Sequence, residues 1–423
     1  MKTILNKIFS RSKNLNFLDN SFEKLKKELK IETIFNSIEK FSKNSEIRYV
    51  GGCVRKILNN EEIDDIDLAV NLNPTEVSEV LKKNNIRFYS TGIEHGTVTA
   101  LVDKKKFEIT SLREDIITDG RHAKVRFSSD WNKDASRRDF TINAVYADIN
   151  GNLFDPFDGK KDLENGKVNF IGDPEKRIKE DYLRILRYIR FFLSYSKHEH
   201  EEKIISAVRK NLDGVSQISS ERLLDEFRKF FYSKGFLRLN DDSFSMEIIE
   251  LIFPQFKNIS VFKSLNNFAL KKINDLDFIF FLSILIVDGS DNTDYFMYKF
   301  NISKKDKKRI NFLNNFYSNI SSKTFTTKNL SKIFYYEGKQ SLLDLLYFQI
   351  FRSKKIDKKI ISFIDYFKDK EPPLLPLRAI TLMTKYNIPE GKELGDKLKK
   401  IENKWVDNDF KISDSEIQKV LNN

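Results

Sequence analysis

A glycine pair followed by two closely spaced aspartates constrains this chain more than any other feature. Gly51 and Gly52 follow the apolar run Ile47–Val50, and Asp65 and Asp67 come shortly after. A glycine turn lets a phosphate approach the backbone closely. In a strand, residues two apart face the same side, so we expect both aspartates to project together. Two carboxylates beside a phosphate-binding turn can hold Mg²⁺ for phosphoryl or nucleotidyl transfer.

Each half of this pattern alone is also typical of an ordinary turn or a solvated loop. The apolar residues Ile66, Leu68 and Val70 favour a strand around the aspartates. Glu108 lies in another short predicted strand and could add a third carboxylate to the cluster. From its own segment, an exposed strand glutamate is the simpler interpretation of Glu108.

The charge balance favours a polyanionic partner. The chain has 423 residues, with 74 Lys and Arg against 62 Asp and Glu, a net charge of +12. Nucleic acid is the first candidate partner and a membrane surface the second, although a lysine-rich soluble protein could have the same balance. The single cysteine, Cys53, excludes an intrachain disulfide and a cysteine-rich zinc site. We expect a cytoplasmic protein, because residues 1–14 lack a secretory apolar region and the apolar run 278–287 is too short for a bilayer.

Hydrophobic periodicity predicts an α+β protein, with a small mixed sheet near the N-terminus and helices after it. A helical pattern over 20–45 precedes the sheet, and another helix is predicted between Thr75 and Lys83. The predicted strands are Ile47–Val50, Ile66–Val70, Ile86–Tyr89, Thr97–Val102, Phe107–Thr110 and Val145–Asp148. Helical patterns then follow at about 178–194, 201–211, 219–232, 244–253 and 275–287.

Two further segments carry candidate chemistry. In the first, Arg137 and Arg138 precede Asp139, and Asn143 follows. Guanidinium forks match phosphate oxygens, and a carboxylate can accept from a sugar hydroxyl, so this segment suits a nucleoside triphosphate. A helix start or a surface ion pair is the structural alternative.

In the second segment, Asp181, Arg184, Arg187 and Arg190 are spaced by three, which places them along one face of a predicted helix. An aspartate with an arginine offers both acceptors and donors to the edge of a base. An exposed helix laced with salt bridges is the alternative interpretation.

Together these segments resemble a known family. Gly51-Gly52-Cys53-Val54-Arg55, Asp65-Ile66-Asp67, the segment 137–144 and the segment 180–184 occur in the order and spacing of class II tRNA nucleotidyltransferases. These are the CCA-adding enzymes and their relatives, the bacterial poly(A) polymerases. Further similar segments lie at 91–98, 155–159, 172–174 and 220–226.

The resemblance implies template-independent addition and repair of the 3′-terminal CCA of tRNA from CTP and ATP. It implies two Mg²⁺ ions on Asp65 and Asp67, assisted by Glu108. It implies nucleotide binding by Gly51, Gly52, Arg55, Arg137, Arg138, Asp139, Asn143, Asp181, Arg184, Arg187 and Arg190. Among these, Asp181 and Arg184 would read the base, and Glu180, Arg222 and Glu226 would support that template.

The resemblance also implies a domain order. A helical lead-in (1–46) would precede a nucleotidyltransferase head (47–173), a neck with the base template (174–240), a helical body (241–370) and an RNA-binding tail (371–423). The helical regions would grip the acceptor and T-arm backbone of tRNA, and we infer no protein partner and no membrane. The segment 113–134, with Arg121-His122-Ala123, is similar to the flexible loop that helps the family switch from C to A addition.

Alternatives within the family remain: a poly(A) polymerase, or an enzyme that adds only CC or only A. A catalytically silent RNA-binding protein is the alternative from another class. One residue departs from the family pattern, because Lys56 stands where an aspartate is usual after Gly51-Gly52-Cys53-Val54-Arg55. This substitution reverses a charge near the expected nucleotide.

Overall fold

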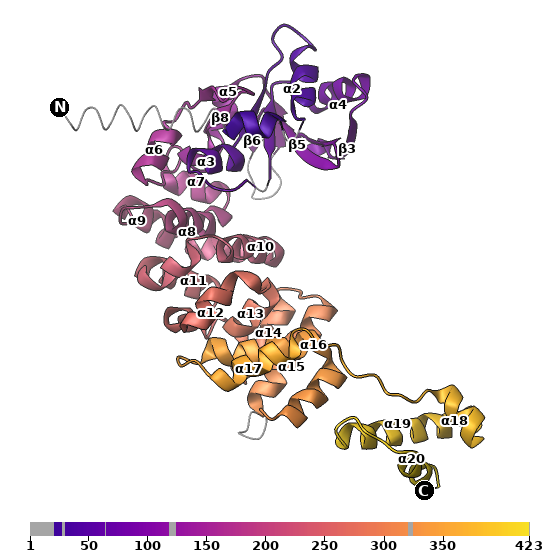
Figure 1. Cartoon of the computed structure of the whole chain (residues 1–423). Coiled ribbons are helices and arrows are strands. Elements are labelled where there is room, and N and C mark those ends of the chain that lie inside the picture. Colours follow the sequence, from indigo (N-terminus) through magenta and orange to yellow (C-terminus); the bar gives the residue numbers. More distant parts are fainter. Residues whose placement is uncertain (1–20, 28–29, 64, 118–123, 320–324, 423) are drawn as a thin grey trace, which may run out of the picture. The chain divides into compact units, whose positions relative to one another are not determined.

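The computed structural model describes residues 21–27, 30–63, 65–117, 124–319 and 325–422. The chain forms two compact units, Met1–Ser245 and Met246–Asn423. The first unit holds the mixed sheet and the helices that follow it, and the second unit is helical in its described part (Figure 1). The α+β class predicted from the sequence is confirmed. The five-part domain division stays a prediction.

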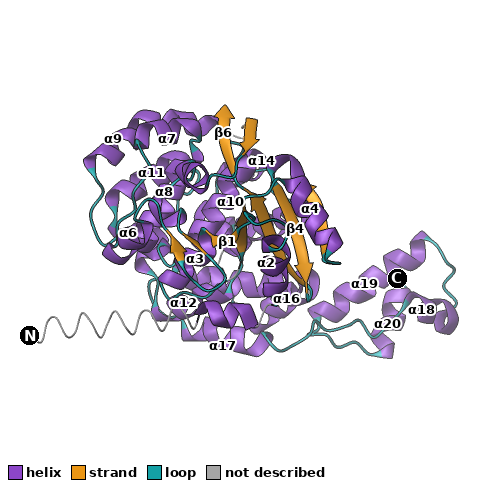
Figure 2. Ribbon diagram, turned by 90° about the horizontal axis from the view of Figure 1, so that it is seen from above, coloured by secondary structure: helices purple, strands orange, loops and turns teal. Residues whose placement is uncertain are grey.

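A mixed seven-stranded sheet forms the centre of the first unit (Figure 2). Only the pair β2–β5 is parallel among its paired strands, and the other pairs are antiparallel. A separate two-stranded ribbon consists of β6 (Arg113–Ile117) and β7 (Lys124–Phe127). In spatial order, the sheet strands are β3 (Arg87–Gly92), β4 (Thr97–Val102), β5 (Lys105–Ser111), β2 (Asp67–Val70), β1 (Ile47–Val50), β8 (Tyr146–Ala147) and β9 (Leu153–Phe154).

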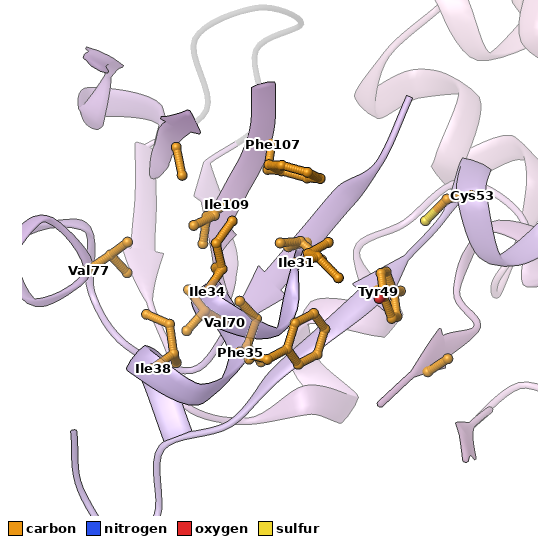
Figure 3. Close-up of a cluster of buried hydrophobic side chains, with 14 of the residues drawn as sticks. Ile31, Ile34, Phe35, Ile38, Tyr49, Cys53, Val70, Val77, Phe107 and Ile109 are labelled. Atoms are coloured by element: carbon orange, nitrogen blue, oxygen red, sulfur yellow. The ribbon is translucent and has the colours of Figure 1, made fainter. Parts of the chain in front are cut away.

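One face of the sheet carries a large hydrophobic core. Apolar residues alternate along the strands, and those on this face pack against α2 (Glu32–Glu39) and α4 (Pro74–Lys83). Figure 3 shows Phe35 and Ile38 of α2 with Val70 and Ile109 of the strands in this cluster. Because alternate residues face opposite sides, Asp67 and Glu108 are directed to the other face of the sheet.

The helical lead-in is divided, whereas the sequence predicted one helix over 20–45. A helix covers 21–27, and α2 begins at Glu32. Between them Lys30 has a φ of 49°, and one continuous helix cannot pass through this residue because an α-helix needs a negative φ. The other predicted helix of the head is confirmed: α4 begins at Pro74 behind a capping box formed by Asn73 and Glu76.

The helices after the sheet include one break that matters for the site. The sequence predicted a continuous helix over about 178–194, but α7 ends at Glu180 and α8 begins at Leu183. Asp181 between them has extended backbone, with φ −156° and ψ 106°. The helices of this part are α5 (Trp131–Ser136), α6 (Gly159–Asn165), α7 (Pro174–Glu180), α8 (Leu183–Tyr195), α9 (Glu202–Asn211), α10 (Ser220–Phe231) and α11 (Ser243–Ile252), with the 3₁₀ helices η2 (Thr141–Asn143), η3 (Leu212–Gln217) and η4 (Phe236–Asp241).

The second unit begins within α11 and includes the 3₁₀ helices η5 (Ile259–Ser264) and η6 (Ile273–Asp275). Its further helices are α12 (Asn267–Lys272), α13 (Phe278–Ile286), α14 (Asn292–Lys299), α15 (Lys304–Ser318), α16 (Thr327–Arg352), α17 (Lys358–Phe367), α18 (Ala379–Tyr386), α19 (Lys392–Asp407) and α20 (Asp414–Leu421). The apolar run 278–287, too short for a bilayer, forms α13, which is buried over most of its length. Across the described part of the chain, every helix is too short or too polar to span a bilayer.

Candidate active site

A pocket of about 860 Å³ opens in the first unit, on the side of the sheet that bears Asp67. Residues from the head, from α8 and from the end of α10 line it together. Of the residues predicted to form the site, the lining includes Gly51, Gly52, Arg55, Asp65, Asp67, Arg138, Asp139, Asn143, Arg187 and Arg190. The sequence therefore identified residues of four distant segments that share one pocket.

The glycine turn leaves open space at the start of α3 (Gly52–Leu58). Gly51 has a φ of 67°, a conformation that favours glycine, and a Cβ built on Gly52 would meet no atom within 4 Å. One turn later, the buried Arg55 guanidinium lies 4.7 Å from the ring centroid of Phe191 and donates to Asn143 Oδ1. Its buried Nε has no hydrogen-bond partner within the described residues. Open backbone and an unpaired buried donor suit an anionic ligand such as a phosphate.

The acidic side of the pocket lies at the start of β2. Asp67 is the first residue of this strand and is paired in register with Glu108 of β5. Asp65 precedes the strand, so the two aspartates do not share a strand as the sequence predicted, but both line the pocket. Burial raises the pKa of Asp67, and Glu108 and Asp65 raise it further against the opposing effect of Arg138. Crowded carboxylates of this kind favour a bound cation.

The carboxylates of Asp65 and Asp67 fit a magnesium ion whose remaining ligands come from a substrate and from water. Among the described residues, no group of three or more His, Cys, Asp and Glu side chains is arranged to hold a metal. Glu108 lies beside Asp67 but is not part of the pocket lining. Mg²⁺ commonly takes one or two protein carboxylates and completes its shell with substrate phosphates and water. Asp65 and Asp67 supply that donor set, without a third carboxylate from Glu108.

The two adjacent arginines are fixed by one buried carboxylate. Asp134 of α5 is 1% exposed and accepts from Arg137 Nη2 at 2.6 Å and Arg138 Nη2 at 3.1 Å. The Tyr146 hydroxyl donates to the same carboxylate at 2.7 Å. Burial lowers the pKa of Arg138, but Asp134 and Tyr146 raise it well above its ordinary value, so Arg138 is a permanent cation. Only Arg138 of this pair lines the pocket, and Arg137 lies outside the lining.

Asp139 links the head to α8. Its carboxylate accepts from Asn143 Nδ2 at 2.9 Å and from Arg187 Nε at 2.7 Å. Burial opposes ionisation, but Arg187 and Asn143 hold the pKa of Asp139 far below its ordinary value. Glu226 of α10 lies 2.5 Å from Arg190 Nε and 3.7 Å from Arg187 Nη1. Arg187 is thus held between two buried carboxylates, Asp139 and Glu226, whereas Arg190 is held by Glu226.

The predicted base readers lie elsewhere in this structure. Asp181 Oδ2 accepts from Arg222 Nη2 at 2.7 Å, and Asp181 Oδ1 accepts from the backbone N–H of Leu183 at 3.2 Å. Arg184 Nη1 donates to Glu180 and to the carbonyl of Arg177. Neither Asp181 nor Arg184 lines the pocket. Because the helix breaks at Asp181, this residue does not continue the face of Arg187 and Arg190, contrary to the sequence prediction.

Several pocket residues were not predicted from the sequence. Glu61 accepts from Lys234 Nζ at 2.5 Å and from the Tyr195 hydroxyl at 3.1 Å, so it joins the head to the turn after α10 and to α8. No local motif reveals this contact, because its partners are far apart in the sequence. Four other residues of the pocket lining follow helical spacing in the sequence, so a shared helix face could have been predicted for them: Asp225, Arg228, Lys229 and Tyr232. Lys56, the departure noted above, also lines the pocket.

Comparison with known proteins agrees with this geometry. Residues 47–169 match the poly A polymerase head domain family. The human mitochondrial CCA tRNA nucleotidyltransferase 1 is 46% identical over 168 residues, which make up 39% of this chain and 39% of that protein. The aligned region thus covers well under half of the length of this relative. Residues 47–169, which contain the whole sheet and the acidic side of the pocket, therefore form a head domain of the poly A polymerase type.

Longer matches extend beyond the head. The CCA-adding enzyme of Lactococcus lactis subsp. cremoris is 30% identical, covering 85% of this chain and 89% of that protein. The crystal structure of the Bacillus stearothermophilus CCA-adding enzyme in complex with CTP has a TM-score of 0.65 at 20% identity, covering 89% of this chain and 92% of that one. The chain belongs to the class II CCA-adding enzyme family.

Proposed function

We propose that the protein adds and repairs the 3′-terminal CCA of tRNA, using CTP and ATP without a nucleic-acid template. The observation that carries the proposal is the pocket in which Asp65, Asp67 and Arg138 meet the glycine turn. Family membership supports it, as does the Lactococcus relative, which is named a CCA-adding enzyme and is matched over most of its length.

The chain's own residues position the nucleotide. The open backbone at Gly52 and the cations Arg55 and Arg138 receive the triphosphate, because they place donors and positive charge around one cavity. Asp139 is held ionised by Arg187 and lies where a sugar hydroxyl can donate to it. Fixing both reactants in one geometry removes much of the entropic barrier to their reaction.

Asp65 and Asp67 would hold Mg²⁺, with Glu108 beside them as a further negative charge. A metal held by these carboxylates would supply Lewis acidity toward the attacking hydroxyl and the leaving pyrophosphate. Base selection by Asp181 and Arg184 is part of the proposal, and it requires these residues to exchange their present contacts for the base. Arg222 and Glu226, which contact Asp181 and Arg190, support the template helix.

The proposed macromolecular substrate is tRNA, bound through its acceptor and T-arm backbone. The net charge of +12 supports contacts to phosphates. Solved structures with a similar fold include a Thermotoga maritima CCA-adding enzyme complexed with tRNA. The cytoplasmic location predicted from the sequence belongs to the same proposal. The human relative is named as mitochondrial, so fractionation of the source cells is the measurement that decides the location.

The test of the proposed function uses a tRNA that ends before CCA. It is incubated with labelled CTP and ATP, singly and together, and the products are separated at single-nucleotide resolution. We expect two C and one A to be added, after which the reaction stops. A long A tail would identify a poly(A) polymerase, addition of C or A alone would identify a partial enzyme, and no incorporation would identify a silent RNA-binding protein.

A substitution series tests the acidic pair. Asp65→Ala and Asp67→Ala should each abolish incorporation, because each removes a carboxylate of the metal site, while leaving tRNA binding largely intact. Asp294→Ala, at an exposed position of α14, is the matched control and should retain full activity. Near-wild-type incorporation by either site variant would refute the assignment of these carboxylates.

A further inference from the structure

One side of the pocket has no task in the nucleotide binding described above. Asp225, Arg228, Lys229 and Tyr232 follow the helical spacing i, i+3, i+4, i+7, which places them on one face at the end of α10. This set is termed the α10 face. All four residues line the same pocket as Asp65 and Asp67. The α10 face therefore confronts the space in which the reaction would occur.

Tyr232 is the aromatic residue of the α10 face. It continues the last turn of α10, with its N–H bonded to the carbonyl of Arg228 at 3.1 Å. Its ring meets the buried ring of Phe231 edge-on, at 5.3 Å between centroids and 76° between planes. Tyr232 nevertheless remains 54% exposed. Tyr232 therefore combines a ring held by its neighbour with exposure at the pocket.

The charges of the α10 face complement an RNA strand. Arg228 and Lys229 precede Tyr232 by about one helical turn, and Lys229 stays half-exposed although Asp225 lies 2.8 Å from its Nζ. An accessible aromatic ring flanked by basic side chains is the usual combination for binding single-stranded nucleic acid, because the ring stacks on a base while the cations contact phosphates. The Glu61–Lys234 ion pair fixes the adjacent turn to the head.

We propose that the α10 face binds the single-stranded 3′ end of the acceptor RNA, with Tyr232 stacked on its terminal base and Arg228 beside its phosphate. This inference rests on the proposed function. The triphosphate donors Gly52, Arg55 and Arg138 come from the head, whereas the α10 face comes from another part of the chain. A volume of about 860 Å³ lies near the upper end of the range of roughly 300–1,000 Å³ for small-molecule pockets, which leaves room for a second group beside the nucleotide.

The first test separates the two substrates kinetically. Tyr232→Ala should raise the KM for a tRNA that lacks CCA by at least about fivefold, since stacking on an aromatic ring contributes about 1–3 kcal/mol per base. The KM for CTP should not change, and Tyr232→Phe, which keeps the ring, should restore the KM for tRNA. Tyr89→Ala is a matched control at a tyrosine that is 51% exposed on β3 and outside the pocket. An unchanged KM for tRNA, or a raised KM for CTP in its place, would overturn the proposal.

The second test probes the stacked base itself. A tRNA whose terminal nucleoside is abasic should lose affinity for the wild-type protein, while Tyr232→Ala should bind the normal and abasic forms equally. Continued discrimination by Tyr232→Ala would contradict stacking on this ring. If the wild-type protein adds no nucleotide to tRNA, the proposed function fails, but titration of a 3′-fluorescent oligoribonucleotide with wild-type protein and Tyr232→Ala still decides whether the α10 face binds a 3′ end.

Discussion

At the scale of single residues, Asp134 organises the arginine-bearing side of the pocket although it does not line it. Its buried carboxylate receives Arg137, Arg138 and the Tyr146 hydroxyl. Because several donors converge on it, Arg138 reaches the pocket from a fixed position. The sequence marks the two arginines, but the residue that orients them is recognisable only when α5 and β8 come together.

The ionisation of Asp134 predicts a particular acid sensitivity. Burial alone would raise the pKa of Asp134, but Arg138 and Arg137 lower it to about 2. Since this value lies below the ordinary 3.8, the ionised carboxylate stabilises the folded state above about pH 4, and the contribution is lost as the pH falls toward 2. Asp134→Asn should therefore flatten the decline of the free energy of unfolding across this interval, as measured by urea denaturation at each pH.

Asp134→Asn should also lower the free energy of unfolding at neutral pH, by about 3–5 kcal/mol, because the guanidinium groups of Arg137 and Arg138 lose their buried partner. Asp241→Asn, at an exposed position of η4, serves as the control and should keep the wild-type profile. An unchanged slope in Asp134→Asn would show that Asp134 does not govern this acid sensitivity.

At the scale of elements, the break between α7 and α8 determines where the predicted base reader lies. Asp181 leaves the helical path, and Tyr182 packs against Gly214 of η3. A Cβ on Gly214 would lie 2.2 Å from Tyr182 Cε1, so only glycine permits this approach. The break thus depends on a contact with a distant segment as well as on the local sequence.

Gly214→Ala should accordingly displace the Tyr182 ring and lower the free energy of unfolding by about 1–3 kcal/mol. This loss of stability should largely disappear when Gly214→Ala is combined with Tyr182→Ala, which removes the ring that the new methyl group meets. Gly395→Ala is the control, because its Cβ meets no atom within 4 Å inside α19, and it should stabilise the protein by up to about 1 kcal/mol. Additive effects in the double variant would rule out the Tyr182–Gly214 contact as the cause.

At the scale of the whole molecule, the excess of positive charge bears on how RNA binds. A protein that neutralises phosphates releases condensed counterions, so its affinity falls steeply as salt concentration rises. With a net charge of +12, we expect the affinity for tRNA to fall at least about tenfold between 50 and 200 mM KCl. Filter binding over this range measures the slope of log K against log salt. A slope near zero would contradict a phosphate-dominated interface.

The sequence predicted those parts of the fold that local patterns determine. The strands β1, β2, β4 and β5 were placed correctly within a few residues, because each contains a short run rich in apolar or β-branched residues. The ribbon β6–β7 and the two-residue strand β9 were not predicted, because these strands are short and neither segment of a pair indicates its partner. Of the loop predicted over 113–134, Arg121, His122 and Ala123 lie outside the described residues.

The residues of the site, like the strands, could be predicted where local sequence motifs contain them. Asp65, Asp67, Arg138 and Asp139 belong to local motifs, and the structure brings them into one pocket. Contacts between distant segments were beyond the sequence, because nothing in either segment alone indicates its partner. The Glu61–Lys234 pair is such a contact, and the pairing of Asp181 with Arg222 likewise decides where Asp181 points.

The strand order has a consequence for synthesis of the protein on the ribosome. β1 lies between β2 and β8, so the strand that precedes the glycine turn acquires its second neighbour only when Tyr146 and Ala147 have been translated. Until then, β1 retains an open edge, a known risk for mispairing during folding. The active-site face of the sheet is therefore completed late, after nearly the whole head has emerged.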